Sequence, residues 1–208
     1  MRANSVVRDF TPSLFSRRRF LGAVAIGQVT LLASAVAGGD SGRVHLEPTP
    51  AVGAEPTPEE TTGPFFRPDS PLRGDFRATG IKGIPVRLSG LVLDDRGRTI
   101  PGVLLDFWHA NADGEYDLKG FGCRGHQFSD PSGRYFLETV VPGLYPGRTR
   151  HYHVRLQAAH GPILSTQLYF PEEARNATDA LFRPDLLLKM REAGGLRLAT
   201  FNFVLATV

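Results

Sequence analysis

Hydrophobic and polar residues alternate along most of the chain beyond residue 84, in the two-residue period that is typical of half-buried β-strands. Turn residues, chiefly Gly, Pro, Asp and Asn, interrupt this alternation at near-regular intervals. The segments that favour strands are 85–95, 103–110, 126–141 (two strands around a turn at 130–133), 150–159, 163–170 and 196–208. Short strands with this spacing predict an all-β fold, a β-sandwich of mixed or antiparallel strands.

Three segments depart from the strand pattern. Residues 59–80 combine aromatic residues with many turn residues, so we expect an irregular segment that packs on the domain. Residues 171–182 and 184–195 have short helical character, and Gly194 and Gly195 favour a helix end at the close of the second. The sandwich should therefore carry an irregular N-terminal segment and short helices near the C-terminus.

Residues 1–37 have the features of an export signal. A basic stretch (Arg17–Arg19) precedes a short apolar run that ends in the small residues Ala35-Val36-Ala37. Paired arginines followed by Phe-Leu resemble the twin-arginine class of signals, which predicts export through that machinery. A membrane anchor is the alternative, but Gln28 and Thr30 interrupt a run of only 18 residues, which favours cleavage.

The rest of the chain forms a Pro/Gly-rich, flexible lead-in over 38–58 and one domain over 59–208. Although the whole chain has a net charge of +3, residues 1–37 hold five of the basic residues and one acidic residue. The remainder has 19 basic and 20 acidic residues, a formal net charge of −1, so no nucleic-acid partner is indicated. Cys123 is the only cysteine and excludes an intramolecular disulfide.

The segment "LYPGRTRHYHVRL", residues 144–156, contains the strongest candidate metal ligands. On a strand, His151 and His153 project from one face and Tyr152 from the other. By itself His-x-His is a weak signal. A zinc or copper protein could complete such a pair with His109 or His126, each of which stands at a strand edge among turn residues.

Two tyrosines change this picture. Tyr145 follows a Pro-Gly turn, so it can fold back over the histidine strand, and Tyr116 follows the expected end of the strand 103–110. A phenol loses its proton at neutral pH only beside a strong Lewis acid. Phenolate is a hard, anionic ligand suited to Fe(III), so two phenolates and two imidazoles would form a ferric site with an open position.

Several motifs in the same order resemble the intradiol ring-cleavage dioxygenases, which are non-haem Fe(III) enzymes that open catechols between their two hydroxyls. They are "TTGPFF", "GVLLDFWHANADGEYD", "RGHQFSDPSGRYFLETVVPGLYPGRTRHYHVRL" and "STQLYF". The compact spacing between Tyr145 and the histidines is similar to the exported branch of the family. The resemblance implies a catalytic β-sandwich and the ferric ligands Tyr116, Tyr145, His151 and His153.

The resemblance also implies roles in catalysis. Arg148 falls on the catalytic arginine and Gln167 on the active-site glutamine, while Tyr145 is the ligand expected to leave when a catechol binds. O2 would then be incorporated to give a muconate-type diacid. Taken alone, Arg148 could instead pair with a surface carboxylate, with Arg150 as a competing neighbour.

Two rival functions stay open at this point. One is a non-enzymatic, prealbumin-like binding module, which residues 88–108 also resemble. The other is the copper or zinc protein built on histidines. The identity of the catechol and the oligomeric state do not follow from the sequence.

Overall fold

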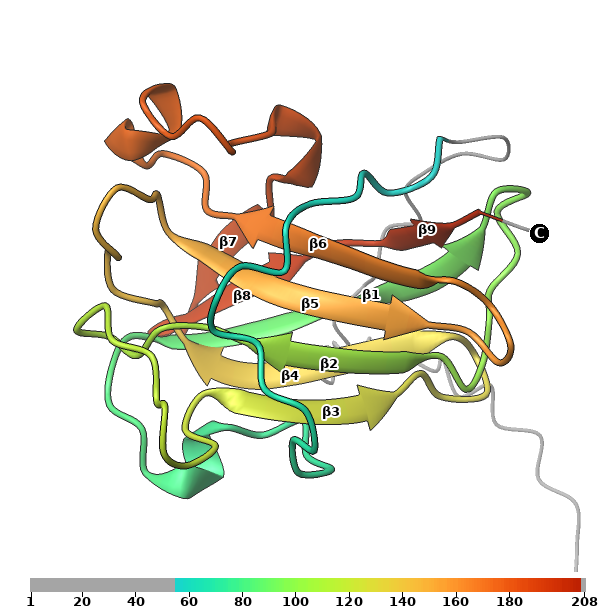
Figure 1. The fold of residues 1–208 in the computed structure, drawn as a ribbon, viewed down its shortest axis with the longest axis horizontal. Helices are drawn as coiled ribbons and strands as arrows, with labels where there is room; N and C mark the ends of the chain where they lie inside the picture. Colours follow the sequence, from blue (N-terminus) through green and yellow to red (C-terminus); the bar gives the residue numbers. More distant parts are fainter. Residues whose placement is uncertain (1–54, 207–208) are drawn as a thin grey trace, which may run out of the picture. The chain divides into compact units, whose positions relative to one another are not determined.

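Two β-sheets pack face to face in the computed structural model, which describes residues 55–206 (Figure 1). One sheet has the order β4-β1-β8-β7, and β9 pairs with β1 beyond β8. The other has the order β3-β2-β5-β6. In chain order the strands are β1 (Pro85–Asp94), β2 (Leu104–Trp108), β3 (Arg124–Phe128), β4 (Arg134–Val140), β5 (His151–Gln157), β6 (Ile163–Tyr169), β7 (Lys189–Ala193), β8 (Leu196–Thr200) and β9 (Phe203–Leu205).

The predicted β-sandwich is confirmed, including its mixed pairing. β1 pairs in parallel with both β8 and β9, whereas the other strand pairs are antiparallel. Apolar side chains from the inner faces form one core between the sheets, with members such as Leu88, Leu105, Leu137 and Val154, all fully buried. Alternation along each strand therefore supplies one face to this core and leaves the other face available.

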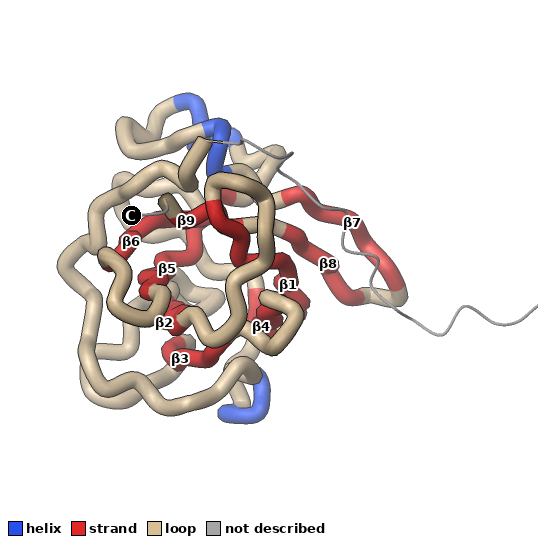
Figure 2. The backbone as a smooth tube through the Cα atoms, turned by 90° about the vertical axis from the view of Figure 1, so that its right-hand side faces the viewer, coloured by secondary structure: helices blue, strands red, loops and turns tan. Residues whose placement is uncertain are grey.

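The expectation of a helix over 184–195 is wrong. Only Pro184–Leu186 forms a helical turn, of the 3₁₀ type, and Lys189–Ala193 is β7. Gly194 and Gly195 have φ angles of 58° and 76°, so they form a tight hairpin turn that joins β7 to β8 rather than a helix end. This hairpin extends away from the rest of the described residues (Figure 2).

The other expected elements near the C-terminus are shorter or more divided than the pattern indicated. Residues 171–182 contain a single 3₁₀ turn, Ala174–Ala177, and a third such turn, Arg77–Thr79, lies before β1. The expected terminal strand 196–208 is split into β8 and β9, which both lie beside β1.

An irregular segment, residues 57–76, crosses the outer face of the β3-β2-β5-β6 sheet (Figure 1). We call it the strap. Its backbone is tied to the sheet at both ends: the Glu60 N–H donates to the Ser165 carbonyl oxygen (2.8 Å), and the His126 N–H donates to the Pro71 carbonyl oxygen (2.9 Å). The expected irregular but packed segment is confirmed, and the strap encloses the sheet face that carries the candidate ligands.

The expected export signal, residues 1–37, and most of the lead-in lie outside the described residues. Within residues 55–206, no helix is long and apolar enough to cross a membrane.

The core makes a direct prediction about stability. Leu105 is fully buried, so Leu105→Ala should lower the free energy of unfolding by about 2–5 kcal/mol. Leu72, which is 69% exposed, is the matched control. Leu72→Ala should change the free energy of unfolding by less than about 0.5 kcal/mol. Urea denaturation monitored by circular dichroism measures both values. Equal effects of the two substitutions would contradict this assignment of the core.

Candidate active site

The two histidines of β5 lie side by side on the outer face of their sheet, as predicted. Their Nε2 atoms are 3.1 Å apart, and the residues are only 4% and 2% exposed. Tyr152, between them, points the opposite way into the core and donates a hydrogen bond from its hydroxyl to the Val140 carbonyl oxygen (2.9 Å). Strand alternation therefore brings two imidazole nitrogens together beneath the strap.

Local contacts hold both imidazoles in a form that can bind a metal ion. The Nδ1 of His151 lies 2.7 Å from the Thr149 carbonyl oxygen. Because a carbonyl can only accept, Nδ1 carries the proton and the Nε2 lone pair is available. His153 stacks flat on Trp108, its cross-strand partner, with ring centroids 5.0 Å apart. Burial lowers the pKa of His151 to about 4 and that of His153 well below its usual value, so both rings are neutral at pH 7.

Tyr116 reaches the histidines from the loop after β2. Its hydroxyl oxygen lies 3.4 Å from the His151 Nε2. The carboxylate of the next residue, Asp117, accepts hydrogen bonds from the N–H groups of Lys119, Gly120 and Gly122, which fixes the loop. Burial raises the pKa of Tyr116 to about 12, despite the opposing charges of Arg148 and Arg124. Without a bound cation the Tyr116 side chain is therefore a neutral phenol.

Tyr145 joins this group because two glycines let their loops approach closely. A Cβ atom at Gly143 would lie 2.2 Å from the Gly114 nitrogen, and one at Gly114 would lie 2.3 Å from the Leu144 carbonyl oxygen. Larger residues would force the loops apart. The Tyr145 ring consequently packs edge-on against Tyr116, with ring centroids 5.8 Å apart.

The strap adds two aromatic rings and a glycine that lie against these ligands. Phe65 stacks on Tyr116 (4.3 Å between centroids) and meets Tyr145 edge-on (5.3 Å). Phe66 packs on Trp108 from the same side (5.0 Å). Gly63 has a φ of +68°, and a Cβ atom there would lie 3.3 Å from the His153 Cε1. The strap therefore covers the ligand group closely, and glycine at 63 leaves space beside the imidazole.

Arg148 and Gln167 also meet at this site. Gln167 is the cross-strand partner of His153, and its Oε1 accepts a 2.6 Å hydrogen bond from an Arg148 NH2 group. The alternative interpretation was that Arg148 pairs with a surface carboxylate. Arg148 does pair with a carboxylate, but the side chain of that partner, Asp179, is buried, at only 2% exposed. Arg150 pairs with Glu173 and the Pro142 carbonyl oxygen instead.

The other candidate histidines do not join the pair. His109 bonds to the Ala110 carbonyl oxygen and to the Thr139 hydroxyl, and His126 bonds to Ser70. Burial raises the pKa of Cys123 to about 11, so its thiol is protonated at neutral pH. The packing or supporting roles that the family resemblance implies for His109 and His126 agree with these contacts.

The donor set fits a ferric ion better than zinc or copper. Over residues 55–206, no group of three or more His, Cys, Asp and Glu side chains could hold a metal. A site at the histidine pair therefore depends on phenol oxygens, which are hard anionic donors once deprotonated and suit Fe(III). Tyr116, Tyr145, His151 and His153 are the residues that could hold it.

Sequence reasoning did not single out Phe65, Trp108 and Asp179 as parts of the site. Trp108 could have been found, because the alignment of β2 with β5 places it opposite His153. Phe65 belongs to a recognised motif, but no pattern indicates that it stacks on Tyr116. Asp179 lies in a segment whose path the sequence does not specify.

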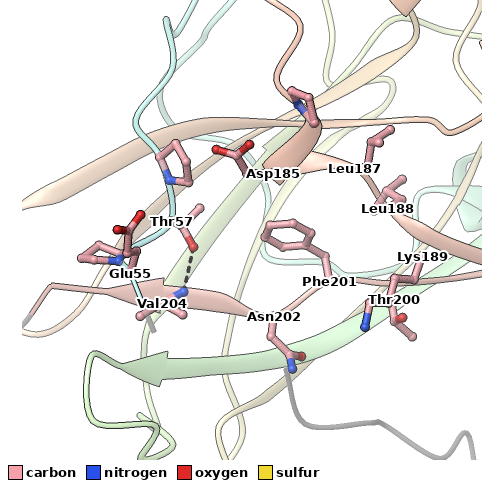
Figure 3. A pocket seen from close by; sticks show the side chains of 13 residues that line it. Glu55, Thr57, Asp185, Leu187, Leu188, Lys189, Thr200, Phe201, Asn202 and Val204 are labelled. Carbon is pink, nitrogen blue, oxygen red and sulfur yellow. Dashed lines mark hydrogen bonds between the residues drawn. The ribbon is translucent and has the colours of Figure 1, made fainter. Parts of the chain in front are cut away.

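A cavity of about 520 Å³ lies elsewhere, between residues 55–58 and the start of β7 (Figure 3). Phe201, Leu187 and Leu188 line it together with Asp185 and Glu55. None of the six predicted site residues lines this cavity. The candidate active site therefore stays at the histidine pair.

Comparison with known proteins agrees with this fold. A family model described as "Dioxygenase" matches residues 62–207. The solved dioxygenase domain of a dioxygenase carbohydrate-binding protein fusion from Streptomyces sp. SirexAA-E is 52% identical, with a TM-score of 0.72, covering 74% of this chain and 100% of that one. Hydroxyquinol 1,2-dioxygenase from Pseudomonas putida DLL-E4 is 26% identical, with a TM-score of 0.66, covering 74% of this chain and 67% of that one.

Among curated proteins, the protocatechuate 3,4-dioxygenase beta chain of Burkholderia cepacia is 32% identical over 136 residues, covering 54% of this chain and 58% of that protein. The matches with the first three curated relatives span 30–62% of the lengths of those proteins.

The Asp117 loop generates a prediction about pH. Hydrogen bonds from the N–H groups of Gly120 and Gly122 lower the pKa of the Asp117 carboxyl, against the effect of burial. The stabilisation is therefore fully present above the unfolded-state pKa of about 4 and is lost as the pH falls through the lower folded-state pKa. Asp117→Ala should lower the thermal midpoint at pH 7, and the deficit should shrink from about pH 5 to pH 2. A deficit that is constant with pH would contradict this role.

Proposed function

The chain belongs to the intradiol ring-cleavage dioxygenase family, and from this premise we propose that it is an exported, non-haem Fe(III) enzyme that cleaves a catechol between its two hydroxyls. Both atoms of O2 enter the product, a muconate-type diacid. The observation that carries the proposal is the meeting of the His151 and His153 Nε2 atoms with the Tyr116 hydroxyl, with Tyr145 packed alongside.

The ligands in this proposal are Tyr116, Tyr145, His151 and His153. When bound, Fe(III) acts as a Lewis acid that draws electron density from the catechol and lowers the pKa of phenols near it. Both tyrosines would bind the ion as phenolates, although burial favours the neutral phenol of Tyr116 in the absence of a cation. Two phenolates compensate much of the +3 charge, which makes the buried site tolerable electrostatically.

The two tyrosines have different tasks. Tyr116 stays in place, because Phe65 stacks on its ring and the neighbouring Asp117 loop is held by three backbone N–H groups. Tyr145 lies in the turn region 143–147, and its ring meets Phe65 and Tyr116 edge-on. Tyr145, the ligand that the family resemblance implies is displaced, would give up its position when a catechol binds, and its oxygen could then take up a catechol proton.

Arg148 stabilises the negative charge that develops on the substrate ring. Its guanidinium is held in advance by Gln167 and Asp179, so little reorganisation is needed during the reaction. Gln167 is in turn fixed to the strap, since its Nε2 donates to the Thr61 carbonyl oxygen (3.1 Å). The strap covers the site and limits the access of water to it.

Export is the other part of the proposal. It is supported by the arginine pair, apolar run and Ala-Val-Ala sequence of residues 1–37. We propose the twin-arginine machinery as the partner in transport, because a protein that takes up its metal before export must cross the membrane folded.

Replacing Arg17 and Arg18 by Lys should retain the protein in the cytoplasm, measured by fractionation of cells that express the full chain.

Oxygen uptake tests the proposed reaction. Purified protein, folded in iron-replete cells, should consume O2 with at least one member of a panel of catechol, protocatechuate, hydroxyquinol and substituted catechols. It should also show a visible charge-transfer band from the phenolate ligands. An iron-replete, colourless preparation that is inert toward the whole panel would overturn the proposal, and an iron-free protein that still binds ligands would favour the binding-module alternative.

His153→Ala tests the ligand assignment. Loss of one of the two imidazole ligands should abolish the visible band and reduce bound iron to below about a tenth of the wild-type content. Replacing a residue that only supports a ligand typically lowers metal affinity by about 10–100-fold, and replacing a direct ligand should lower it more. Metal analysis and absorption spectra measure this. His126→Ala is the control and should keep iron and colour, since His126 bonds to Ser70 away from the pair.

A further inference from the structure

Asp179 is a buried carboxylate that the proposed reaction does not itself use. It lies between β6 and β7, in the segment 170–188 that passes beyond the ends of β5 and β6 (Figure 1). Its side chain is 2% exposed. A buried charge with no partner is costly, so its hydrogen bonds indicate what the carboxylate stabilises.

Asp179 and Gln167 bind different nitrogens of the same Arg148 guanidinium. The Arg148 Nε lies 2.9 Å and 3.1 Å from the two carboxylate oxygens, while an NH2 group of the same guanidinium donates to Gln167 (2.6 Å). The planar guanidinium is thus held through two of its nitrogens by two different residues, which fixes its rotation as well as its position.

The same carboxylate also holds the backbone next to Arg148. The Thr149 N–H donates to Asp179 Oδ2 (2.8 Å), and the Thr149 hydroxyl donates to Asn176 Oδ1 (2.7 Å). The carbonyl oxygen of Thr149 accepts the hydrogen bond from the His151 Nδ1. One residue, itself 1% exposed, therefore connects Asp179 to the orientation of a candidate ligand.

We propose that Asp179 is a positioning residue that fixes Arg148 directly and His151 through Thr149, so that the segment 170–188 sets the geometry of the active site. This inference rests on the proposed function for its catalytic consequence. Its geometric part, the coupling of Asp179 to His151, does not depend on turnover.

A second ion pair on the same segment supplies a matched control. Glu173 accepts a 3.0 Å hydrogen bond from the Arg150 Nε, so it also joins segment 170–188 to the residues before β5. Its side chain is 24% exposed, and within residues 55–206 the Arg150 side chain bonds to Glu173 and the Pro142 carbonyl oxygen rather than to Gln167 or the histidines. If loss of one ion pair were the only consequence, substitutions of Asp179 and of Glu173 should reduce activity to the same extent.

The first measurement compares Asp179→Asn with Glu173→Gln in the iron-loaded protein. Asp179→Asn should lower kcat by about 10–100-fold with KM changed less than about threefold, because a misplaced Arg148 loses stabilisation of developing charge. Glu173→Gln should stay within twofold of wild type in both constants. Asp179→Asn activity within twofold of wild type, or equal losses in both variants, would overturn the proposal.

A double-mutant cycle tests whether Asp179 acts through Arg148. Arg148→Gln combined with Asp179→Asn should lose clearly less than the product of the two single losses, because the part of the Asp179 effect that acts through Arg148 is already gone and only the part that acts through His151 remains. Multiplied losses would mean that Asp179 acts independently of Arg148 and would overturn that part of the proposal. If Asp179→Asn fails to fold by circular dichroism, Asp179→Glu keeps the charge but shifts it, and should show the same loss of kcat.

A readout without turnover separates failure of this inference from failure of the proposed function. In the metal-free protein, the ¹⁵N and ¹H resonances of the His151 imidazole should shift in Asp179→Asn and not in Glu173→Gln. Unchanged His151 resonances would overturn the coupling through Thr149. If wild-type protein is inert toward every catechol while the resonances shift as expected, the proposed function fails and the positioning of His151 by Asp179 stands.

Discussion

Side-chain alternation along β5 is the constraint on which the site depends. Tyr152, Val154 and Leu156 supply the core, so His151 and His153 must occupy the opposite face. A shift of one residue in the pairing of β5 with β2 and β6 would exchange these faces and bury imidazoles among apolar side chains. The same core contacts that stabilise the sandwich therefore determine where the two candidate ligands point.

That outer face could bind a metal only because other segments enclose it. The outer side of an antiparallel sheet is commonly solvated, but here the strap covers it and leaves both histidines almost fully buried. Burial keeps the imidazoles neutral and Tyr116 protonated, which leaves a group of polar atoms with few protein partners. A cation that deprotonates the phenols would satisfy these atoms, and this is how the enclosure would support the proposed ferric site.

The sequence predicted the strands of the sandwich more successfully than the segments between them. β1 carries an alternating pattern, β2 lies in a largely apolar run typical of a buried strand, and the strap was recognised as irregular but packed. The prediction of a helix over 184–195 was wrong because a Gly-Gly pair can either end a helix or form a hairpin turn. The hairpin forms here because β8 pairs with β1 and β7 pairs with β8. Local propensity could not supply that tertiary contact.

The same distinction explains which site residues were accessible from sequence. His151 and His153 follow from strand geometry, whereas Tyr116, Tyr145, Arg148 and Gln167 became candidates only together, through motifs shared with a family. Asp179 has neither periodicity nor a motif, because its position depends on the course of segment 170–188 through space. A carboxylate that reaches Arg148 from 31 residues away is selected by the fold as a whole, so only the assembled structure can connect it to the histidines.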